Sequence, residues 1–187
     1  MGVPKKISIV ESWRNLSEHV YANNLLPDED GEAFLELAHQ LSLEFAAKTE
    51  MEHLIVRDII HLEWEKRRLR RWICNILRRR AAGFMATALK ESSPQGLGRG
   101  KSVEPLVEEW LNTSGPERDA SEARIRAAGV DPTAIVIQAH NFSQDSVCRF
   151  EADLRSMDTR RRRLMEDLRR LQARRRPDVA DAEIVGG

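Results

Sequence analysis

The sequence predicts an all-α fold: an antiparallel hairpin of two long coiled-coil-like helices with shorter helices packed around it. Hydrophobic residues make up 41% of the 187 residues, which is enough for a core, while only 5% are aromatic and 32% are charged. This composition is typical of long amphipathic helices rather than of a β-sandwich or barrel. Two long segments also repeat apolar residues at spacings that alternate between three and four, the pattern of a coiled coil.

The N-terminal part predicts an arm followed by a helix. Residues 1–27 form the arm, in which "ISIVESW" fits either a short strand or the start of a helix. Pro27 marks a break, after which Asp28 and Asp30 both offer N-cap oxygens. The apolar residues of the helix then recur at helical spacing: Phe34, Leu37, Ala38, Leu41 and Phe45.

The first long helix is expected to begin at Thr49. Residues 28–91 would comprise this helix and the short helix that precedes it. "TEME" has the order of a capping box, with Thr49 at the N-cap and Glu52 three residues later. The helical pattern continues without an internal proline to about Leu89. Residues 92–101 have the composition of a linker.

The linker runs into Gly100-Lys101-Ser102, which matches the end of a nucleotide-binding phosphate loop. Such a loop also needs a glycine at position 95, where this chain has Gln95, and a buried strand before it. The preceding segment has a helical pattern instead. We therefore interpret this stretch as a hinge and not as a site of ATP or GTP hydrolysis.

Residues 102–131 predict two short helices. Ser102 is expected to cap "VEPLVEEWLN", whose proline lies in the first turn. The second helix is expected to begin at Pro116 and to end at Gly129, because glycine tolerates the left-handed backbone that often ends a helix.

Residues 132–176 are assigned to a C-terminal long helix that packs on residues 49–90. The clear helical pattern begins at about Ser143. Before it, "AIVIQ" is rich in β-branched residues, so the conformation of residues 132–142 stays open. Pro177 is expected to end the helix, and residues 177–187 would form a flexible tail.

Each long helix carries an apolar seam. In the first helix the seam residues are Ile55, Ile59, Leu62, Leu69, Ile73 and Ile76. In the second they are Val147, Phe150, Leu154, Met157, Leu164, Leu168 and Leu171. Because burial of each large apolar side chain stabilises by about 1.5–3 kcal/mol, something must cover both seams. The prediction is that they cover one another; the alternative is a dimer in which each helix pairs with its own copy.

An antiparallel alignment of the seams places Leu69 beside Met157 and brings the basic interruptions, Lys66 and Arg161, level with one another. Like charges at one level need either exposure to solvent or a neighbouring carboxylate, for which Glu65 and Asp158 are candidates. A polar layer of this kind often sets helix register.

Two further apolar groups are expected to accept the shorter helices. The first group, Val56, Ile60 and Trp64, is assigned to the helix that begins after Asp30. The second group, Trp72 and Leu77, is assigned to the short helices around Trp110.

Few residues suggest catalysis or metal binding. The pairs Glu36/His39, Glu50/His53 and Asp58/His61 have the i,i+3 spacing of carboxylate-bridged metal bundles, but His53 and His61 face away from the seam. Cys74 and Cys148 have no histidine partner suggested by the sequence, so we interpret both as structural thiols. We predict no catalytic residue, metal, cofactor or small-molecule substrate; an enzyme of unrecognised type stays the less favoured alternative.

Arginine is unusually concentrated, although the formal net charge is zero. Residues 66–80 contain eight basic residues and no acidic one, whereas residues 1–65 contain thirteen acidic and five basic residues. Guanidinium groups bind phosphate in bidentate geometry, so such clusters indicate either a nucleic-acid interface or side chains paired with carboxylates. The candidates are Arg67, Arg68, Arg70, Arg71, Arg78, Arg79, Arg80, Arg160, Arg161, Arg162 and Arg163. In the predicted alignment they form a basic belt at mid-length.

Two blocks of the chain resemble a known family. "NNLLPDEDGEAFLELAHQLSLEFAAKTEMEHLIVRDIIHLEWEKRRLRR" and "RFEADLRSMDTRRRRLMEDLRRLQARRR" are similar to a widespread family of bacterial helical proteins. Its members have an LLPxED-type turn, a WRLRR-like helix and a C-terminal helix of the RYE…LRxLQ type. The family has no established activity, so the resemblance implies only that the two blocks form one structural unit.

Together these observations predict a non-enzymatic helical interaction or assembly protein with an arginine-rich belt. A protein partner or self-association is expected, and the alternative is a nucleic-acid-binding accessory protein, for example one associated with a mobile element. The longest weakly polar run, "AAGFMATAL", is far shorter than the ~20 residues that span a bilayer, and no secretory signal is recognisable. The expected location is therefore the cytoplasm.

Overall fold

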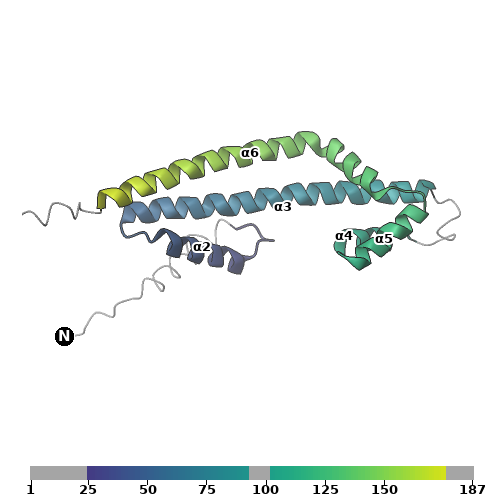
Figure 1. Cartoon of the computed structure of the whole chain (residues 1–187), viewed down its shortest axis with the longest axis horizontal. Helices are drawn as coiled ribbons and strands as arrows, with labels where there is room; N and C mark the ends of the chain where they lie inside the picture. Colours follow the sequence, from purple (N-terminus) through teal and green to yellow (C-terminus); the bar gives the residue numbers. More distant parts are fainter. Residues whose placement is uncertain (1–24, 93–101, 176–187) are drawn as a thin grey trace, which may run out of the picture. The chain divides into compact units, whose positions relative to one another are not determined.

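The computed structural model describes residues 25–92 and 102–175, which form an all-α structure (Figure 1). Its helices are α2 (Gly31–Phe45), α3 (Glu50–Ser92), α4 (Glu104–Asn112), α5 (Pro116–Ala127) and α6 (Pro132–Arg175). The long helices α3 and α6 pack antiparallel, with the shorter helices around them, which confirms the predicted hairpin within one chain.

The chain divides into two compact units, which are described separately. Unit 1 comprises Met1–Trp64 and Arg160–Gly187, and unit 2 comprises Glu65–Thr159. The predicted arm up to residue 24, the phosphate-loop-like stretch 93–101 and the tail from residue 176 lie outside the described residues.

In unit 1 both predicted helix starts are confirmed. Asp30 Oδ1 accepts hydrogen bonds from the backbone N–H groups of Glu32 and Ala33, at 2.9 and 3.1 Å. Thr49 Oγ1 accepts from the Glu52 N–H at 3.2 Å, and the Glu52 carboxylate accepts from the Thr49 N–H at 3.4 Å. These bonds satisfy amide groups that have no partner inside the helix.

The core of unit 1 lies between α2, the first turns of α3 and the last turns of α6. It contains Phe34, Leu37, Ala38, Val56, Ile59, Ile60, Trp64 and Leu168. The Phe34 and Trp64 rings meet edge to face, with centroids 5.2 Å apart, and Trp64 Nε1 donates to Glu29 Oε2 at 3.0 Å. The predicted packing of the Val56, Ile60 and Trp64 row against the short helix is thus confirmed.

The core of unit 2 forms where α4 and α5 pack on the last turns of α3 and the first turns of α6. The buried residues are Ala81, Met85, Leu89, Val103, Leu106, Val107, Trp110, Ile125, Val130, Ile135 and Ala139. The prediction that Trp72 and Leu77 accept the short helices is wrong. The α4–α5 lobe packs at Ala81, Met85 and Leu89 instead, a stripe where a small alanine permits close approach.

Another detail of unit 2 differs from expectation. The predicted N-cap Ser102 is wrong: Val103 is the N-cap of α4, without a side-chain cap, and the Ser102 hydroxyl bonds the Glu104 carboxylate. Helix α6 begins at Pro132, the first residue of the range assigned to the C-terminal long helix, so residues 132–142, whose conformation the sequence left open, are helical. Ile135 and Ala139 are buried in the core, so tertiary packing outweighs the β preference of "AIVIQ".

None of the thirteen seam residues is exposed. Ile59, Leu62, Leu69, Val147 and Leu168 are buried, and the others are half-buried. In unit 1, Ile55 and Ile59 of α3 share a cluster with Leu164 and Leu168 of α6.

The basic residues that interrupt the seams each have a carboxylate partner. In unit 2, Lys66 Nζ lies 2.6 Å from Asp158 Oδ1, with the Lys66 side chain 8% exposed and the Asp158 side chain 50% exposed. In unit 1, Arg161 Nε lies 2.5 Å from Glu63 Oε1. Asp158 is one of the two carboxylates expected beside Lys66, so the polar layer is neutralised by ion pairs and not by exposure.

We expect that replacing Lys66 by an apolar residue changes stability little, whereas removing only its partner Asp158 destabilises the protein. Asp158→Ala leaves a buried ammonium without this partner and should lower the free energy of unfolding by roughly 1–3 kcal/mol, below the range for fully buried pairs because Asp158 is half-exposed. Lys66→Met puts an apolar chain of similar length in the seam and leaves Asp158 in contact with water. It should change stability by less than about 1 kcal/mol. Urea denaturation followed by circular dichroism measures both.

The matched control for this pair is Asp153→Ala, which removes an exposed carboxylate from the same helix. It should be neutral within about 0.5 kcal/mol. A Lys66→Met variant less stable than Asp158→Ala would contradict the assignment, because the ammonium itself would then stabilise the fold.

Candidate nucleic-acid interface

The predicted arginines fall into two groups with different surroundings. Arg67–Arg71 and Arg78–Arg80 lie on α3 in unit 2, and Arg160–Arg163 lie on α6 in unit 1. The predicted belt would join the two groups, and it stays a prediction. Each group is considered within its own unit.

The solvent side of α3 in unit 2 carries what we call the α3 arginine face: Arg67, Arg70, Arg71, Arg78 and Arg79. All five are exposed. Residues 67, 71, 74 and 78 alternate at spacings of four and three, so they form one stripe, and Arg70 and Arg79 flank it. The face extends about 18 Å along the axis at 1.5 Å per residue.

Little within the described residues neutralises this face. Arg67, Arg70, Arg71 and Arg79 form no ion pair with any described carboxylate, and no acidic residue occurs between positions 66 and 80. Unit 2 as a whole has sixteen basic and thirteen acidic residues, a formal charge of +3. Because nearby like charges repel one another, a polyanion that bound this face would reduce the electrostatic repulsion between its arginines.

Some α3 arginines of this group have structural surroundings. Arg78 Nη2 donates to the Leu111 carbonyl at 2.9 Å and to Asn112 Oδ1 at 2.6 Å, at the C-terminal end of α4. The Arg80 guanidinium lies 4.6 Å from the centre of the Phe142 ring. Arg68 is half-buried. Arg78 therefore holds one end of the face against the α4–α5 lobe.

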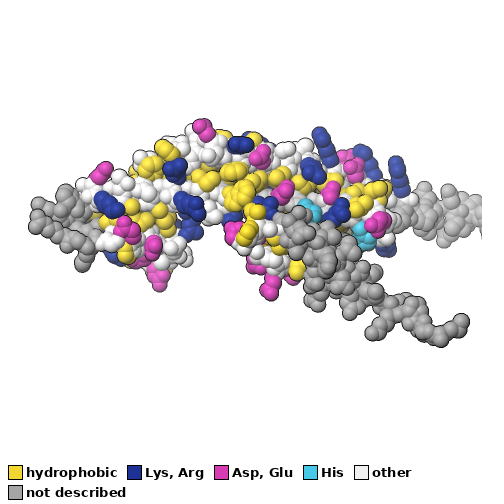
Figure 2. All heavy atoms as spheres, turned by 180° about the vertical axis from the view of Figure 1, so that it is seen from behind, with side chains coloured by type: hydrophobic (Ala, Val, Ile, Leu, Met, Phe, Trp, Pro, Cys, Tyr) yellow, Lys and Arg dark blue, Asp and Glu magenta, His cyan; other side chains and the backbone are white. Residues whose placement is uncertain are grey.

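The arginines of unit 1 lie among carboxylates. Arg161 pairs with Glu63, Arg160 lies 3.9 Å from Asp58, and Arg170 pairs with Glu166. Figure 2 shows Lys and Arg side chains along the C-terminal part of α6 interspersed with Asp and Glu. Arg162 and Arg163 are exposed. This group fits the alternative of solvated, charge-paired helix faces better than the α3 group does.

An exposed aromatic residue, Trp72, lies beside the α3 arginine face and does not pack against the short helices as the sequence predicts. Trp72 keeps 38% of its accessible surface, and its ring packs against Phe150 of α6 with centroids 5.9 Å apart. It shares a helical stripe with Arg68, Asn75 and Arg79, at spacings of four, three and four. This spacing is visible in the sequence and could have indicated that Trp72 lies on a polar side of α3.

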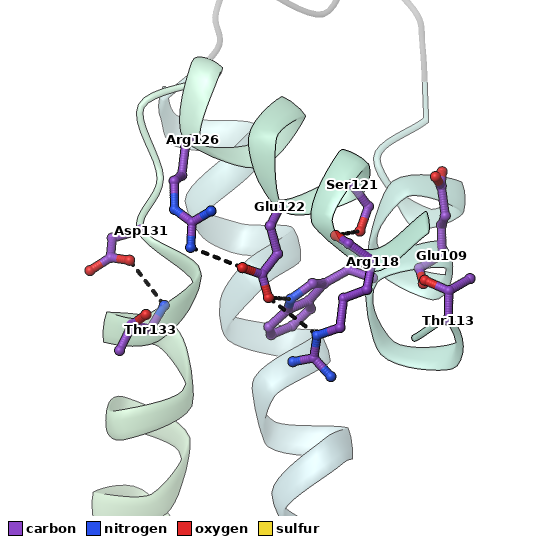
Figure 3. Close-up of polar contacts among 9 residues, drawn as sticks. Glu109, Thr113, Arg118, Ser121, Glu122, Arg126, Asp131 and Thr133 are labelled. Atoms are coloured by element: carbon purple, nitrogen blue, oxygen red, sulfur yellow. Dashed lines mark hydrogen bonds and ion pairs between the residues drawn. The ribbon is translucent and has the colours of Figure 1, made fainter. Parts of the chain in front are cut away.

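The α4–α5 lobe that borders the face is held by a buried tryptophan and a shared carboxylate. Figure 3 shows Glu122 of α5 between Arg118 and Arg126. Glu122 Oε1 accepts from Arg118 Nε at 3.2 Å and from Trp110 Nε1 at 3.4 Å, and Oε2 accepts from Arg126 Nη2 at 2.9 Å. Arg124 of α5 also bonds Glu109 of α4 at 2.8 Å. These contacts fix the two short helices to each other.

Two carboxyl groups of the lobe have lowered pKa values. The hydrogen bond from Arg118 is the main cause of the lowered pKa of Glu122, and Arg126 and Trp110 add to it against the opposing effect of burial. The Ser102 hydroxyl, the Glu104 backbone and Lys90 lower the pKa of Glu104 to about 2. Because the folded-state pKa of Glu122 is depressed, its stabilising contribution is present at neutral pH and is lost as the pH falls through that value.

The remaining sequence candidates do not converge on a reactive site within residues 25–92 and 102–175. No group of three or more metal-binding side chains occurs in these ranges, including the acid-x-x-His pairs. Cys74 and Cys148 are both exposed, so neither thiol fills the hydrophobic core, and their interpretation as structural thiols stays a prediction. None of the described helices has an apolar stretch long enough to cross a bilayer.

Comparisons of the chain with protein-family models, with curated proteins and with solved structures yield no match. We therefore infer function from the geometry and charge of the site.

Proposed function

We propose that this chain is a helical interaction protein that binds nucleic acid through the α3 arginine face. The observation that carries the proposal is the exposed run of five arginines on α3, three of them on one helical stripe, with no acidic residue between positions 66 and 80. A single nucleic-acid strand carries one charge per 3.4 Å of axis in duplex geometry, so a face of about 18 Å matches about five phosphates.

The contrast with unit 1 supports a binding role over a purely solubilising one. Arginines on the last turns of α6 have Asp58, Glu63, Glu166 and Asp167 within 4 Å of a guanidinium. Four arginines of the α3 face have no such partner among the described residues. An acidic protein is the competing partner, and nucleic acid is favoured because its phosphates repeat along a line as the arginines do.

The test is binding of the full-length chain to fluorescently labelled 20-nucleotide single strands and 20-base-pair duplexes, measured by anisotropy at several salt concentrations. We expect affinity to fall steeply with salt. In Arg67→Gln/Arg71→Gln/Arg79→Gln, the slope of log K against log salt should fall by about 2–3, since each lost phosphate contact removes about 0.7–0.9. The fold should persist, because these side chains are exposed.

The matched control is Arg163→Gln/Arg169→Gln/Arg174→Gln, which removes three exposed arginines from α6 in unit 1. It should leave the salt slope within about 0.5 of the unmodified chain. Equal loss in both variants would show that general charge and not the α3 face binds. Absence of binding to either oligonucleotide at ~50 mM salt would overturn the nucleic-acid proposal and favour an acidic protein partner.

A further inference from the structure

We propose that the α3 arginine face recognises single-stranded nucleic acid, with a base stacking on Trp72. This inference rests on the proposed function and specifies its substrate class. Proteins that bind single strands without sequence preference combine cationic side chains for the backbone with aromatic side chains for the bases. Unit 2 offers both along α3, where Trp72 shares a helical stripe with Arg79 of the face.

Trp72 differs from the other tryptophans that the structure describes. Trp64 and Trp110 are 4% and 1% exposed, and the indole N–H of each donates to a glutamate. Trp72 keeps 38% of its surface. Its ring is nevertheless held in place by Phe150, at 5.9 Å between centroids with the rings tilted by 56°. A held but accessible ring loses little conformational freedom when a base stacks on it.

Polar and cationic groups surround this ring along the helix. Arg71 precedes Trp72 directly, and Arg79 follows two turns later, about 10 Å along the axis. Asn75, which is exposed and lies between Trp72 and Arg79 on the stripe, has an amide that both donates and accepts hydrogen bonds. A strand that follows α3 can therefore place phosphates on the arginines and one base on Trp72.

The same arrangement is poorly suited to a duplex. Bases inside a duplex are stacked on one another, so their faces are not available to an external tryptophan. A duplex can contact the arginines but cannot stack a base on Trp72. The exposed ring therefore distinguishes the two forms, whereas the arginines alone do not.

The experiment compares Trp72→Ala and Trp72→Phe with the unmodified full-length chain, using dT20, rU20 and a 20-base-pair duplex in the anisotropy assay. Trp72→Ala should weaken single-strand binding roughly 5- to 150-fold, the range for loss of one stacked base, and change duplex binding less than about 2-fold. Trp72→Phe keeps an aromatic face and should recover most of the affinity. Tryptophan emission should be quenched on single-strand binding, and this quenching should disappear in Trp72→Phe.

The control is Ile137→Ala, which removes an exposed apolar side chain from α6 of the same unit and should leave binding unchanged. Circular dichroism checks that each variant is folded, and Trp72→Phe tests the inference even if Trp72→Ala unfolds. Unchanged single-strand affinity and unchanged quenching in the Trp72 variants would overturn the stacking inference, while loss of binding in the triple α3 arginine variant would still uphold the proposed function. Preference of the unmodified chain for the duplex would also overturn the inference.

Discussion

Trp110→Ala is expected to lower the free energy of unfolding of unit 2 by about 3–5 kcal/mol, the range for truncating a buried tryptophan. Trp110 is 1% exposed and lies in the cluster that joins α4 and α5 to α3. Its hydrogen bond to Glu122 is long, at 3.4 Å, so lost packing and not the lost bond should dominate. Urea denaturation by circular dichroism, with hydrogen exchange of α4 and α5, measures the loss.

Two variants test the cause of this effect. Trp110→Phe keeps a large ring and removes the N–H group. It should lower the free energy of unfolding by about 1–2 kcal/mol, clearly less than Trp110→Ala does. Glu108→Ala changes an exposed residue of the same helix and should be neutral within about 0.5 kcal/mol. If Trp110→Phe cost as much as Trp110→Ala, the hydrogen bond of the indole N–H would contribute more than the buried ring, and the packing explanation would be wrong.

Phe34→Ala is expected to destabilise unit 1 to a similar degree, about 3–5 kcal/mol. Phe34 is 2% exposed and its ring meets Trp64 edge to face, so its removal leaves a cavity beneath α2 and an aromatic ring without its partner. Helix α2 has 15 residues and depends on packing for its stability. Denaturation should shift to lower urea, and the emission of Trp64 should move to longer wavelength as water reaches it.

The neighbouring Leu35 supplies the matched control, because it lies on the same helix but is 37% exposed. Leu35→Ala should cost less than about 1 kcal/mol, since much of its side chain is already in water. Equal destabilisation by the two variants would show that α2 is sensitive to any loss of side-chain volume. The edge-to-face contact would then have no special role.

Much of the fold could be predicted from local signals because those signals have short-range physical causes. The Thr49–Glu52 capping box and the Asp30 N-cap satisfy amides within a few residues, so sequence proximity is enough to recognise them. The alternating spacing of the seams likewise follows from helix geometry. The antiparallel alignment offered Asp158 as one of several ways to accommodate the basic layer, and Lys66 pairs with it.

Sequence alone was insufficient where tertiary packing decided the outcome. The conformation of residues 132–142 stayed open because "AIVIQ" has β-branched residues, and in the structure they form the start of α6, where Ile135 and Ala139 are buried. The lobe packs on Ala81 and Met85 and not on Trp72, a choice that depends on local surface shape. Sequence spacing gives the direction of a side chain but not the partner that covers it.

For the candidate site, the arginine clusters were apparent from composition, but their environments were not. Whether an arginine finds a carboxylate depends on neighbours distant in the chain, as Arg161 and Glu63 show. The same is true of Trp72, whose exposure depends on where the lobe packs. Sequence alone therefore located the arginines without separating those that pair with carboxylates from those that do not.

The stripe that carries Arg67, Arg71 and Arg78 continues directly into Ala81, Met85 and Leu89, which the lobe covers. A single helical stripe is thus an exposed cationic surface in one part and a buried packing surface in the next. Inserting one residue between Arg78 and Ala81 would rotate the lobe about 100° around α3 relative to the arginines, whereas four residues would nearly restore the alignment. In related chains, insertions or deletions in this segment should accordingly correspond to nearly whole helical turns.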